Sequence, residues 1–391
     1  MTAQAGGPLC GILVVDLTRV LAGPYAALML NEFGARVIKV EPPRTGDDSR
    51  HIGPFVKTPS GKTKSGYFMS VNRAKESIAL DLKAAGDRAV FEALLARADV
   101  LIENYRGGTM EKLGYGYEQI KDRYPRLIYC GVSGFGHTGP YAKRPSYDMI
   151  AQAMGGVMSL TGHPDSPPTR VGTSTGDLSA GLFAVVGMIA ALYDRKTTGT
   201  GQKVDISMLD SQVALLENAI SRYVATGQAP GPLGSRHPSI APFAAFATKD
   251  GHIAIAAGND DLFARVARVL GREDLTQDPR FTTNPKRVQN VEALTEELEV
   301  ALSAHSSQHW LAALDEAAVP CGPINNVAQV MADPQVLSRN MIIETLDPDL
   351  GPIRMQGNPV KLSAHPDPKT RAHAPELDEH RAAILKELGL D

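Results

Sequence analysis

The residue with the clearest chemical potential is Asp177, which ends a loop rich in glycine, serine and threonine. A long apolar run follows it, with no further charged residue until Asp194. A run that is apolar on all sides is typical of a buried helix, so Asp177 is expected at or next to the N-terminus of that helix. There the free backbone N–H groups and the helix dipole favour an ionised carboxylate.

Two interpretations of Asp177 follow from this position. Aspartate is a favoured N-cap, so the residue could have a purely structural role. It could also be a carboxylate nucleophile at the edge of a narrow cavity. Small neighbours would let a large substrate come close to it, namely Gly176, Ser179, Ala180 and Gly181. The residues alone leave both interpretations open.

The alternation of strands and helices in the first part of the chain favours an α/β fold with a mostly parallel sheet. Buried strands are predicted over residues 12–16, 37–41, 100–103, 127–130 and 203–206. Pro24 begins a helix that ends before Gly34, and with its flanking strands this helix forms the βαβ unit of a doubly wound sheet. The turn 17–23 is not G-x-G-x-x-G, so no nicotinamide or flavin site is expected.

Two further regions of this first part are assigned from their patterns. Residues 42–76 are predicted to be a long polar loop. An amphipathic helix follows the segment 80–83 and buries Val90, Phe91, Leu94 and Leu95. Downstream, helices are predicted over the apolar run after Asp177 and over 208–225.

The composition changes at Thr226, and residues 226–325 are predicted to form a second, α+β domain. Its first part, 226–242, is rich in glycine and proline, which is typical of a linker or binding loop. A hairpin over 243–257 and helices over 260–270, 290–302 and 308–318 follow. Residues from 326 form a return linker and tail with a strand at 341–344 and a last helix after Pro375.

The composition indicates a soluble, cytoplasmic globular protein of about two domains. The formal charge of −3 gives no support for a nucleic-acid or membrane surface. Three cysteines lie far apart, which favours a reducing compartment, and Cys130 is expected in the core. The N-terminus lacks the basic segment of a secretory signal, and the longest apolar run, 182–193, is too short to span a bilayer.

Other chemistries find little support in the sequence. The histidines do not cluster with cysteines, so no metal site is expected. Residues 176–181 lack the G-x-S-x-G spacing of a nucleophilic serine, and no P-loop sequence occurs. The segments 133–140 and 146–148 follow a predicted strand, at the sheet edge where α/β folds bind ligands. His137 in the first of them has either a functional or a structural role.

Nearly end to end, the chain resembles the family III CoA-transferases, the group that contains formyl-CoA transferase and carnitine CoA-transferase. The matching segments are 16–24, 34–41, 77–83, 99–104, 147–152, 176–177, 198–204 and 320–323. Each segment alone is a weak match, and their order along the whole chain makes them specific. The resemblance implies a Rossmann-like large domain over 1–225, a small α+β domain over 226–325 and a tail over 326–391 that returns to the large domain. It also implies a ring-shaped subunit in an interlocked homodimer.

The resemblance assigns Asp177 the role of nucleophile. Its carboxylate is expected to attack an acyl-CoA thioester and to pass through aspartyl anhydride and aspartyl-CoA thioester intermediates. No metal or permanently bound cofactor is implied, because coenzyme A enters as the substrate, and water must be excluded because an anhydride hydrolyses readily. Contacts with coenzyme A are implied at Ala22, Leu80, Asp81, Leu82, Lys83, Asn104, Tyr105, Arg106, Lys112 and Tyr147.

Two departures from the family pattern concern the coenzyme A contacts. Pro42 and Pro145 stand where formyl-CoA transferase has basic residues. Arg44 and Arg144 are close enough in the sequence to replace them.

A further departure concerns the acceptor acid. Leu21 replaces a glutamine that formyl-CoA transferase keeps beside its small substrate. Arg236 and His237 could meet the far carboxylate of a longer acid through charge-assisted hydrogen bonds. The expected function is therefore CoA transfer between small carboxylic acids, with dicarboxylic acids of succinate size or longer favoured over oxalate.

Two alternatives stay open, one within the same fold and one of a different class. An α-methylacyl-CoA racemase of this fold carries Gly-His-Asp where this chain has Ser146-Tyr147-Asp148. A phenol, with an ordinary pKa of about 10, is a poor base at neutral pH. A catalytically silent CoA-binding protein would have no need of Asp177 as a nucleophile.

Overall fold

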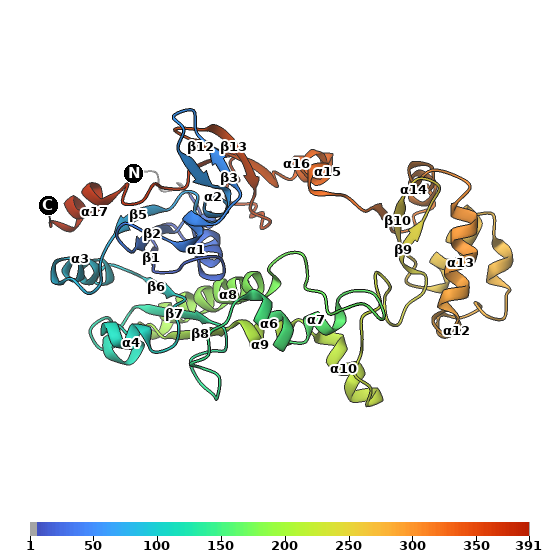
Figure 1. The fold of residues 1–391 in the computed structure, drawn as a ribbon, viewed down its shortest axis with the longest axis horizontal. Coiled ribbons are helices and arrows are strands. Elements are labelled where there is room, and N and C mark those ends of the chain that lie inside the picture. The colour runs from blue at the N-terminus through green and yellow to red at the C-terminus, as the bar shows by residue number, and fades with distance from the viewer. Residues whose placement is uncertain (1–5, 391) are drawn as a thin grey trace. The chain divides into compact units, whose positions relative to one another are not determined.

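The computed structural model describes residues 6–390, which divide into two units. The first unit contains the described residues up to Met158, Arg170–Gln228 and those from Pro334 onward. The second unit contains Ser159–Thr169 and Ala229–Asp333. Each unit has a hydrophobic core of its own. Figure 1 shows the helices and strands of both units.

A six-stranded sheet forms the centre of the first unit. The strand order is β5 (Glu76–Ala79), β2 (Arg36–Glu41), β1 (Leu13–Asp16), β6 (Val100–Glu103), β7 (Ile128–Ser133) and β8 (Lys203–Ser207). All neighbouring strands are parallel, and Val14 of β1 is paired with Val37 of β2 and Val100 of β6. Every residue of β6 is buried, as expected for a strand with helices on both faces. The predicted α/β fold with a parallel sheet is therefore confirmed.

Helices cover the two faces of this sheet because successive strand residues point in opposite directions. Val14 packs on the face covered by α1 (Ala22–Glu32) and α8 (Thr175–Thr198), in a core that also contains Cys130 as predicted. Val15 packs on the other face. Four helices contribute to that second core: α3 (Ala85–Leu95), α4 (Thr109–Leu113), α5 (Tyr117–Ile120) and α17 (Arg381–Leu388).

The helix α8 is buried on one side only, so the prediction that it is buried all round is wrong. Its inner side supplies Ala184 and Met188 to the core, whereas Val186 is 65% and Tyr193 75% exposed. Among the described residues it is the one helix long and apolar enough to cross a membrane, which the apolar run considered alone did not indicate. Because its inner side packs on α1, β7 and β8, α8 is a core helix of this unit.

The prediction of a polar loop over 42–76 is wrong as well. This region contains the 3₁₀ helix η1 (Asp48–His51), the hairpin of β3 (Phe55–Lys57) and β4 (Thr63–Ser65), and the helix α2 (Gly66–Asn72). The Ser65 side chain accepts a hydrogen bond from the Phe68 backbone and so caps α2. Phe68 and Met69 are buried against residues near 350–355, a long-range contact that no local pattern indicates.

The remaining elements of the first unit lie after β7 and in the C-terminal part. The predicted helix over 208–225 is two helices, α9 (Met208–Ala214) and α10 (Glu217–Thr226). The helix α6 (Asp148–Met154) precedes α8. The short α7 (Val157–Leu160) follows α6 and includes the point after Met158 where the chain passes into the second unit. Beyond α16 (Pro334–Ser338), a small sheet has the order β13 (Gly351–Gln356), β12 (Ile342–Asp347) and β14 (Thr370–Ala372).

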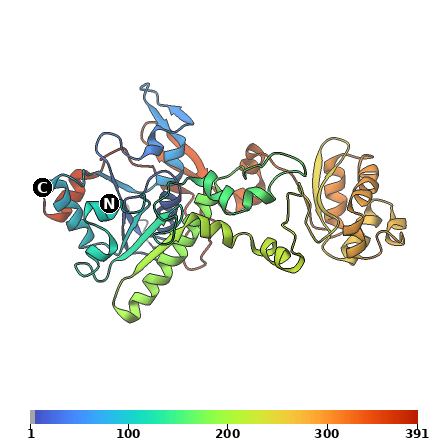
Figure 2. The same cartoon turned by 60° about the horizontal axis from the view of Figure 1, so that its bottom comes forward.

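The second unit pairs a small antiparallel sheet with a group of helices (Figure 2). The predicted hairpin is present as β9 (Phe243–Ala247) and β10 (His252–Ala256), and β11 (Cys321–Pro323) extends it. The predicted helices are α11 (Asp260–Val269), α13 (Val291–Leu302) and α14 (Ser307–Glu316). The structure adds η2 (Glu273–Thr276), α12 (Asn284–Gln289) and α15 (Val327–Ala332).

Candidate active site

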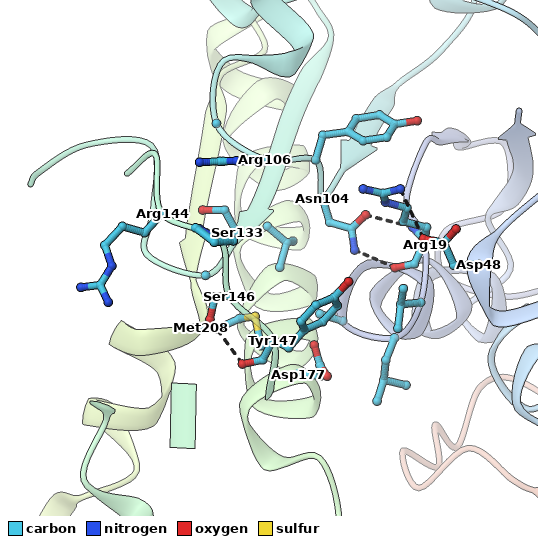
Figure 3. Close-up of a pocket in the computed structure, with 18 of the residues that line it drawn as sticks. Arg19, Asp48, Asn104, Arg106, Ser133, Arg144, Ser146, Tyr147, Asp177 and Met208 are labelled. Carbon is cyan, nitrogen blue, oxygen red and sulfur yellow. Dashed lines mark hydrogen bonds and ion pairs between the residues drawn. The ribbon is translucent and has the colours of Figure 1, made fainter. Parts of the chain in front are cut away.

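A cavity of about 230 Å³ opens in the first unit beside the turns that follow β1, β6 and β7. In a parallel sheet these turns lie at the carboxyl edge, the usual place for a ligand. Figure 3 shows the residues that line the cavity. The structure brings together eight of the predicted site residues here: Leu21, Ala22, Asn104, Tyr105, Arg106, Arg144, Tyr147 and Asp177.

A second cavity of about 310 Å³ contains the predicted segment Leu80, Asp81, Leu82 and Lys83. Tyr105 belongs to the lining of both cavities, so the two are adjacent. The predicted contact Lys112 lies on the exposed side of α4 and lines neither of them.

The two arginines suggested as replacement contacts have different surroundings. Arg144 lines the first cavity, and its guanidinium lies 4.6 Å from the centroid of the Tyr141 ring. Figure 3 shows that side chain directed away from Asp177. Arg44 lines a third cavity together with Arg50 and Lys64 and is absent from the linings of the first two.

The predicted acceptor residues Arg236 and His237 belong to the second unit. The His237 ring is 5.2 Å from the ring of Phe243, and its Nδ1 accepts a hydrogen bond from the Ser239 backbone. Leu21, the third of these residues, belongs to the first unit and lines the cavity, where it is 8% exposed.

A buried ion network holds the β1–α1 turn that supplies Leu21 and Ala22. The Lys39 ammonium is 2.8 Å from the Asp47 carboxylate and donates to the carbonyl of Thr18 at 2.6 Å. Lys75 is 2.9 Å from Asp16, and the Val20 N–H donates to Asp47 at 3.0 Å. Burial alone would raise the pKa of Asp16, but Lys75 and Lys39 outweigh it and hold that pKa below its ordinary value. Buried ion pairs thus fix the β1–α1 turn, in which Val20 has a φ of 67°.

Asn104 and Arg106 join this turn to two other loops of the cavity. The Asn104 amide accepts from the Arg19 N–H at 2.9 Å and donates to the Arg19 carbonyl at 2.7 Å. The Arg106 Nε donates to the carbonyl of Lys143 at 2.8 Å. Because each bond joins segments distant in sequence, the cavity wall is held together across three loops.

Asp177 faces this cavity as the third residue of α8, whose N-cap is Ser174. It is therefore not the cap, and within residues 6–390 its carboxylate has no hydrogen-bond or ion-pair partner. Burial, and then the nearby Asp148 carboxylate, raise the pKa of Asp177 to about 7. The expectation that the helix N-terminus holds it ionised is thus wrong: desolvation and a like charge dominate.

The small residues near Asp177 pack helices and do not line the cavity, contrary to the role suggested for them. A Cβ on Gly181 would lie 2.8 Å from the carbonyl of Ala22, so this glycine lets α8 approach α1. A Cβ on Gly176 would lie 3.1 Å from Ala151 and Asp148 of α6. Ser179 and Ala180 are buried. In α8 only Asp177 belongs to the cavity lining.

His137 contacts neighbouring residues of the first unit and has a structural role. Its Nε2 is 3.6 Å from the buried Glu103 carboxylate, and its backbone N–H donates to Asp205. Its ring covers Gly131, where a Cβ would lie 2.5 Å from the ring. Burial, with Lys203 second, lowers the pKa of His137, and the ring does not line the cavity.

Sequence reasoning missed Ser133 and Asp148, although both belong to segments that it singled out. Ser133 belongs to the cavity lining, and its hydroxyl oxygen is buried and has no hydrogen-bond partner among the described residues. Asp148 follows Tyr147 directly and accepts a hydrogen bond from the backbone of Gly176. The available signal was their place at or beyond the end of β7, at the edge of the sheet.

Metal ligands were assessed from the histidines and cysteines. The pair His305 and His309 has the i, i+4 spacing of a helical metal site, which the sequence analysis overlooked. Their ring centroids are 4.2 Å apart, with the ring planes tilted by 34°. Across residues 6–390 no group of three or more His, Cys, Asp or Glu side chains is arranged to hold a metal ion.

Comparisons with known proteins give one consistent result. A model of CoA-transferase family III matches residues 9–381. The acetyl-CoA:oxalate CoA-transferase of Acetobacter aceti is 48% identical over 98% of this chain and 97% of its own length. The succinyl-CoA:glutarate CoA-transferase of Mus musculus is 40% identical over 97% of this chain and 86% of its own. The crystal structure of a CAIB/BAIF family protein from Brucella suis, 42% identical, superposes with a TM-score of 0.87 and covers 98% of this chain and 99% of that one.

Proposed function

The chain belongs to CoA-transferase family III and is a CoA-transferase, and from that premise we propose that Asp177 is its nucleophile. The observation that carries the proposal is the setting of this carboxylate. It faces a cavity lined by positions matched to coenzyme A contacts. Among the described residues, none donates a hydrogen bond to its oxygens or forms an ion pair with them. A carboxylate that is neither a cap nor an ion-pair partner is available for covalent catalysis.

The exchange proceeds in four displacements. The Asp177 carboxylate attacks the thioester carbonyl of the donor, the C–S bond breaks, and an acyl-aspartyl anhydride and CoA thiolate form. The thiolate then attacks the aspartyl carbonyl and releases the donor acid, leaving an aspartyl-CoA thioester. The acceptor carboxylate attacks this thioester and expels the thiolate again. In the last step the thiolate attacks the acceptor's acyl carbon, which yields the new acyl-CoA and restores the Asp177 carboxylate.

Coenzyme A is divided between the two adjacent cavities in this proposal. The thioester end lies in the cavity with Asp177, and the nucleotide end lies in the cavity with Leu80–Lys83. Three cations of the first cavity, Arg19, Arg106 and Arg144, suit carboxylate and phosphate groups. The unpartnered Ser133 hydroxyl suits a polar atom of the ligand, because a buried hydroxyl without a partner is unfavourable.

The large domain is Rossmann-like in this proposal. Numbered along the chain, its parallel strands have the order 3-2-1-4-5-6, the order of doubly wound nucleotide-binding sheets. The boundaries stay those of the sequence analysis, with the large domain over 1–225, the small domain over 226–325 and the tail over 326–391. We assign the protein to the cytoplasm, with acyl-CoA and a free carboxylic acid as its small-molecule partners and no permanently bound cofactor.

The first prediction concerns assembly as an interlocked homodimer. Apolar side chains gather on the outer side of α8 and on α6, where a second copy would cover them. They are Leu182, Phe183, Val186, Ile189, Tyr193, Met149, Ile150 and Met154. Sedimentation analysis should find a dimer at every accessible dilution, because interlocked rings part only on unfolding. A monomer at low concentration would exclude this assembly.

The second prediction concerns the pH dependence of the reaction. The nucleophile must be ionised, and the pKa of Asp177 is raised to about 7. The value of kcat/KM should therefore fall as the pH decreases through about 7, roughly tenfold for each unit below it. Initial rates from about pH 5 to about pH 9, with a check that the protein stays folded, measure this acid limb. A rate that is constant down to the ordinary range of an aspartate would contradict the assignment.

The third prediction concerns the acceptor. The similar proteins include one named for oxalate and one named for glutarate. We expect acids of succinate size or longer to be preferred here, because apolar Leu21 in the cavity offers no hydrogen bond to a compact acid. Arg236→Ala should raise the acceptor KM without a comparable loss of kcat. The test is competition between oxalate, succinate and glutarate, with Arg268→Ala, which changes an exposed arginine of the second unit, as the control. Strong preference for oxalate would contradict the size argument.

The racemase alternative makes a different demand on the site. It needs a second proton-transfer group where this chain has Tyr147, whereas CoA transfer needs only the carboxylate of Asp177. Deuterium wash-in at Cα of a 2-methylacyl-CoA, without CoA exchange, would favour the racemase.

A further inference from the structure

A hydrogen-bonded cluster contacts the first turn of α8, the turn that carries Asp177. Its centre is Asp148, the first residue of α6, which is 8% exposed. One carboxylate oxygen, Oδ1, accepts the backbone N–H of Gly176 at 2.9 Å. The other oxygen, Oδ2, accepts from Gln152 at 2.9 Å and from the Arg170 guanidinium at 3.1 Å. Asp148 thus contacts the peptide next to the nucleophile on one side and an arginine on the other.

The segment 170–176 is anchored to α6 at both of its ends. The Arg170 side chain is bonded to Asp148, and the Val171 N–H donates to the side-chain oxygen of Gln152 at 2.9 Å. At the other end a Cβ on Gly176 would lie 3.1 Å from Ala151 and Asp148, so a larger residue there would push against α6. The position of the Asp177 backbone therefore depends on where the Asp148 carboxylate is held.

We propose that Arg170 is a positioning residue for Asp177 that acts through Asp148. It fixes the carboxylate that holds the Gly176 peptide, and its positive charge offsets the negative charge that Asp148 places beside the nucleophile. This inference rests on the proposed role of Asp177 as nucleophile. Arg170 is the one cation paired with Asp148 within the described residues.

The charges around Asp177 give this pair a measurable effect. After burial, Asp148 is the neighbour that raises the pKa of Asp177. Tyr67 of α2 also interacts with Asp177, and its pKa is raised to about 12 by burial and then by Asp177, Asp47 and Asp148. Among the residues that the structure describes, no lysine or arginine lowers the pKa of Asp177 directly. The charge of Arg170 reaches the nucleophile by way of its ion pair, and its side chain is 41% exposed, so a modest effect is expected.

The test measures how fast acyl-CoA alone modifies Asp177 as a function of pH. In Arg170→Gln the uncompensated charge of Asp148 should move the acid limb of this rate to higher pH, by about half a pH unit. Arg170→Lys keeps the charge and should restore the limb to its original position. Asp148→Asn removes the like charge yet keeps an oxygen for the Gly176 N–H, so its limb should move to lower pH.

A general structural defect would not move the acid limb in opposite directions in Arg170→Gln and Asp148→Asn, so opposite shifts indicate an effect of positioning and charge. The matched control is Arg123→Gln, which removes an exposed arginine paired with Glu92 at 3.3 Å, outside the cavity lining, and should leave the limb unmoved. A rate lowered equally at every pH in Arg170→Gln would overturn the proposal. If Arg170→Gln does not fold, a limb that stays in place in Asp148→Asn would overturn it instead. Failure of the wild-type protein to form any adduct on Asp177 would refute the proposed nucleophile itself, a result distinct from either of these.

Discussion

Replacing Asp177 with asparagine is expected to abolish CoA transfer and to leave the fold intact. The amide matches the carboxylate in shape but cannot attack a thioester, so the loss of rate should be at least ~10⁴-fold, as for other removed nucleophiles. The structure changes the expectation for stability, because Asp177 is not the N-cap of α8 and its loss removes no cap. The two effects are therefore separable in one variant.

The same variant should be more stable than the wild-type protein at alkaline pH. The pKa of Asp177 is raised to about 7 in the folded state, above the ordinary value near 3.8. Folding therefore favours the protonated form, and ionisation of Asp177 destabilises the fold as the pH rises from about 4 to about 7. Above that range Asp177→Asn should gain up to about 4 kcal/mol in the free energy of unfolding, and near pH 4 it should gain nothing.

The two measurements are an exchange assay and urea unfolding at an acidic and an alkaline pH. The control is Asp194→Asn, which changes an exposed aspartate of the same helix outside the cavity lining and should alter neither quantity. Mass spectrometry must confirm that the asparagine has not deamidated. More than a small residue of activity in the intact amide, or an equal stability difference at both pH values, would contradict the account of Asp177.

The sheet could be predicted from the sequence to the extent that its strands are continuous apolar runs. Val100–Glu103 has this pattern apart from its last residue, and Arg36–Glu41 has apolar residues on both sides of Lys39; both strands were located to within a residue. The edge strand Glu76–Ala79 has a polar residue at each of its first two positions and was missed. The helix Gly66–Asn72 was missed because its buried side chains pack on the C-terminal part of the chain. Burial that depends on distant segments leaves no local periodicity.

The site shows the same division between local and long-range information. Asp177 could be found from its own surroundings in the chain, a polar loop followed by an apolar helix. Its protonation could not, because the pKa depends on burial and on Asp148, which lies 29 positions earlier. The ion pair of Lys39 with Asp47 likewise needed the tertiary fold. The CoA-contact positions came from the family resemblance, and most of them line one of two adjacent cavities.

The second large effect is expected in a trapping experiment, since acyl-CoA alone should leave a covalent adduct on Asp177. The first two displacements need no acceptor, so the protein should accumulate an anhydride or an aspartyl-CoA thioester. Hydroxylamine attacks the aspartyl carbonyl, expels the acid or the CoA thiolate, and converts the side chain to a hydroxamate. Inactivation should then be nearly complete with acyl-CoA present and absent without it.

This experiment also locates the intermediate, because a nucleophile can attack either carbonyl of an anhydride. Attack on the donor's acyl carbon releases Asp177 unchanged, whereas attack on the aspartyl carbon of the anhydride or the thioester modifies it. Borohydride reduces the aspartyl thioester to the alcohol, which peptide mass spectrometry should find at position 177. Coenzyme A alone, the free acid alone and Asp177→Asn with acyl-CoA are the controls that should remain unmodified. Equal inactivation without acyl-CoA, or a label on another residue, would mean that the acyl group does not pass through Asp177.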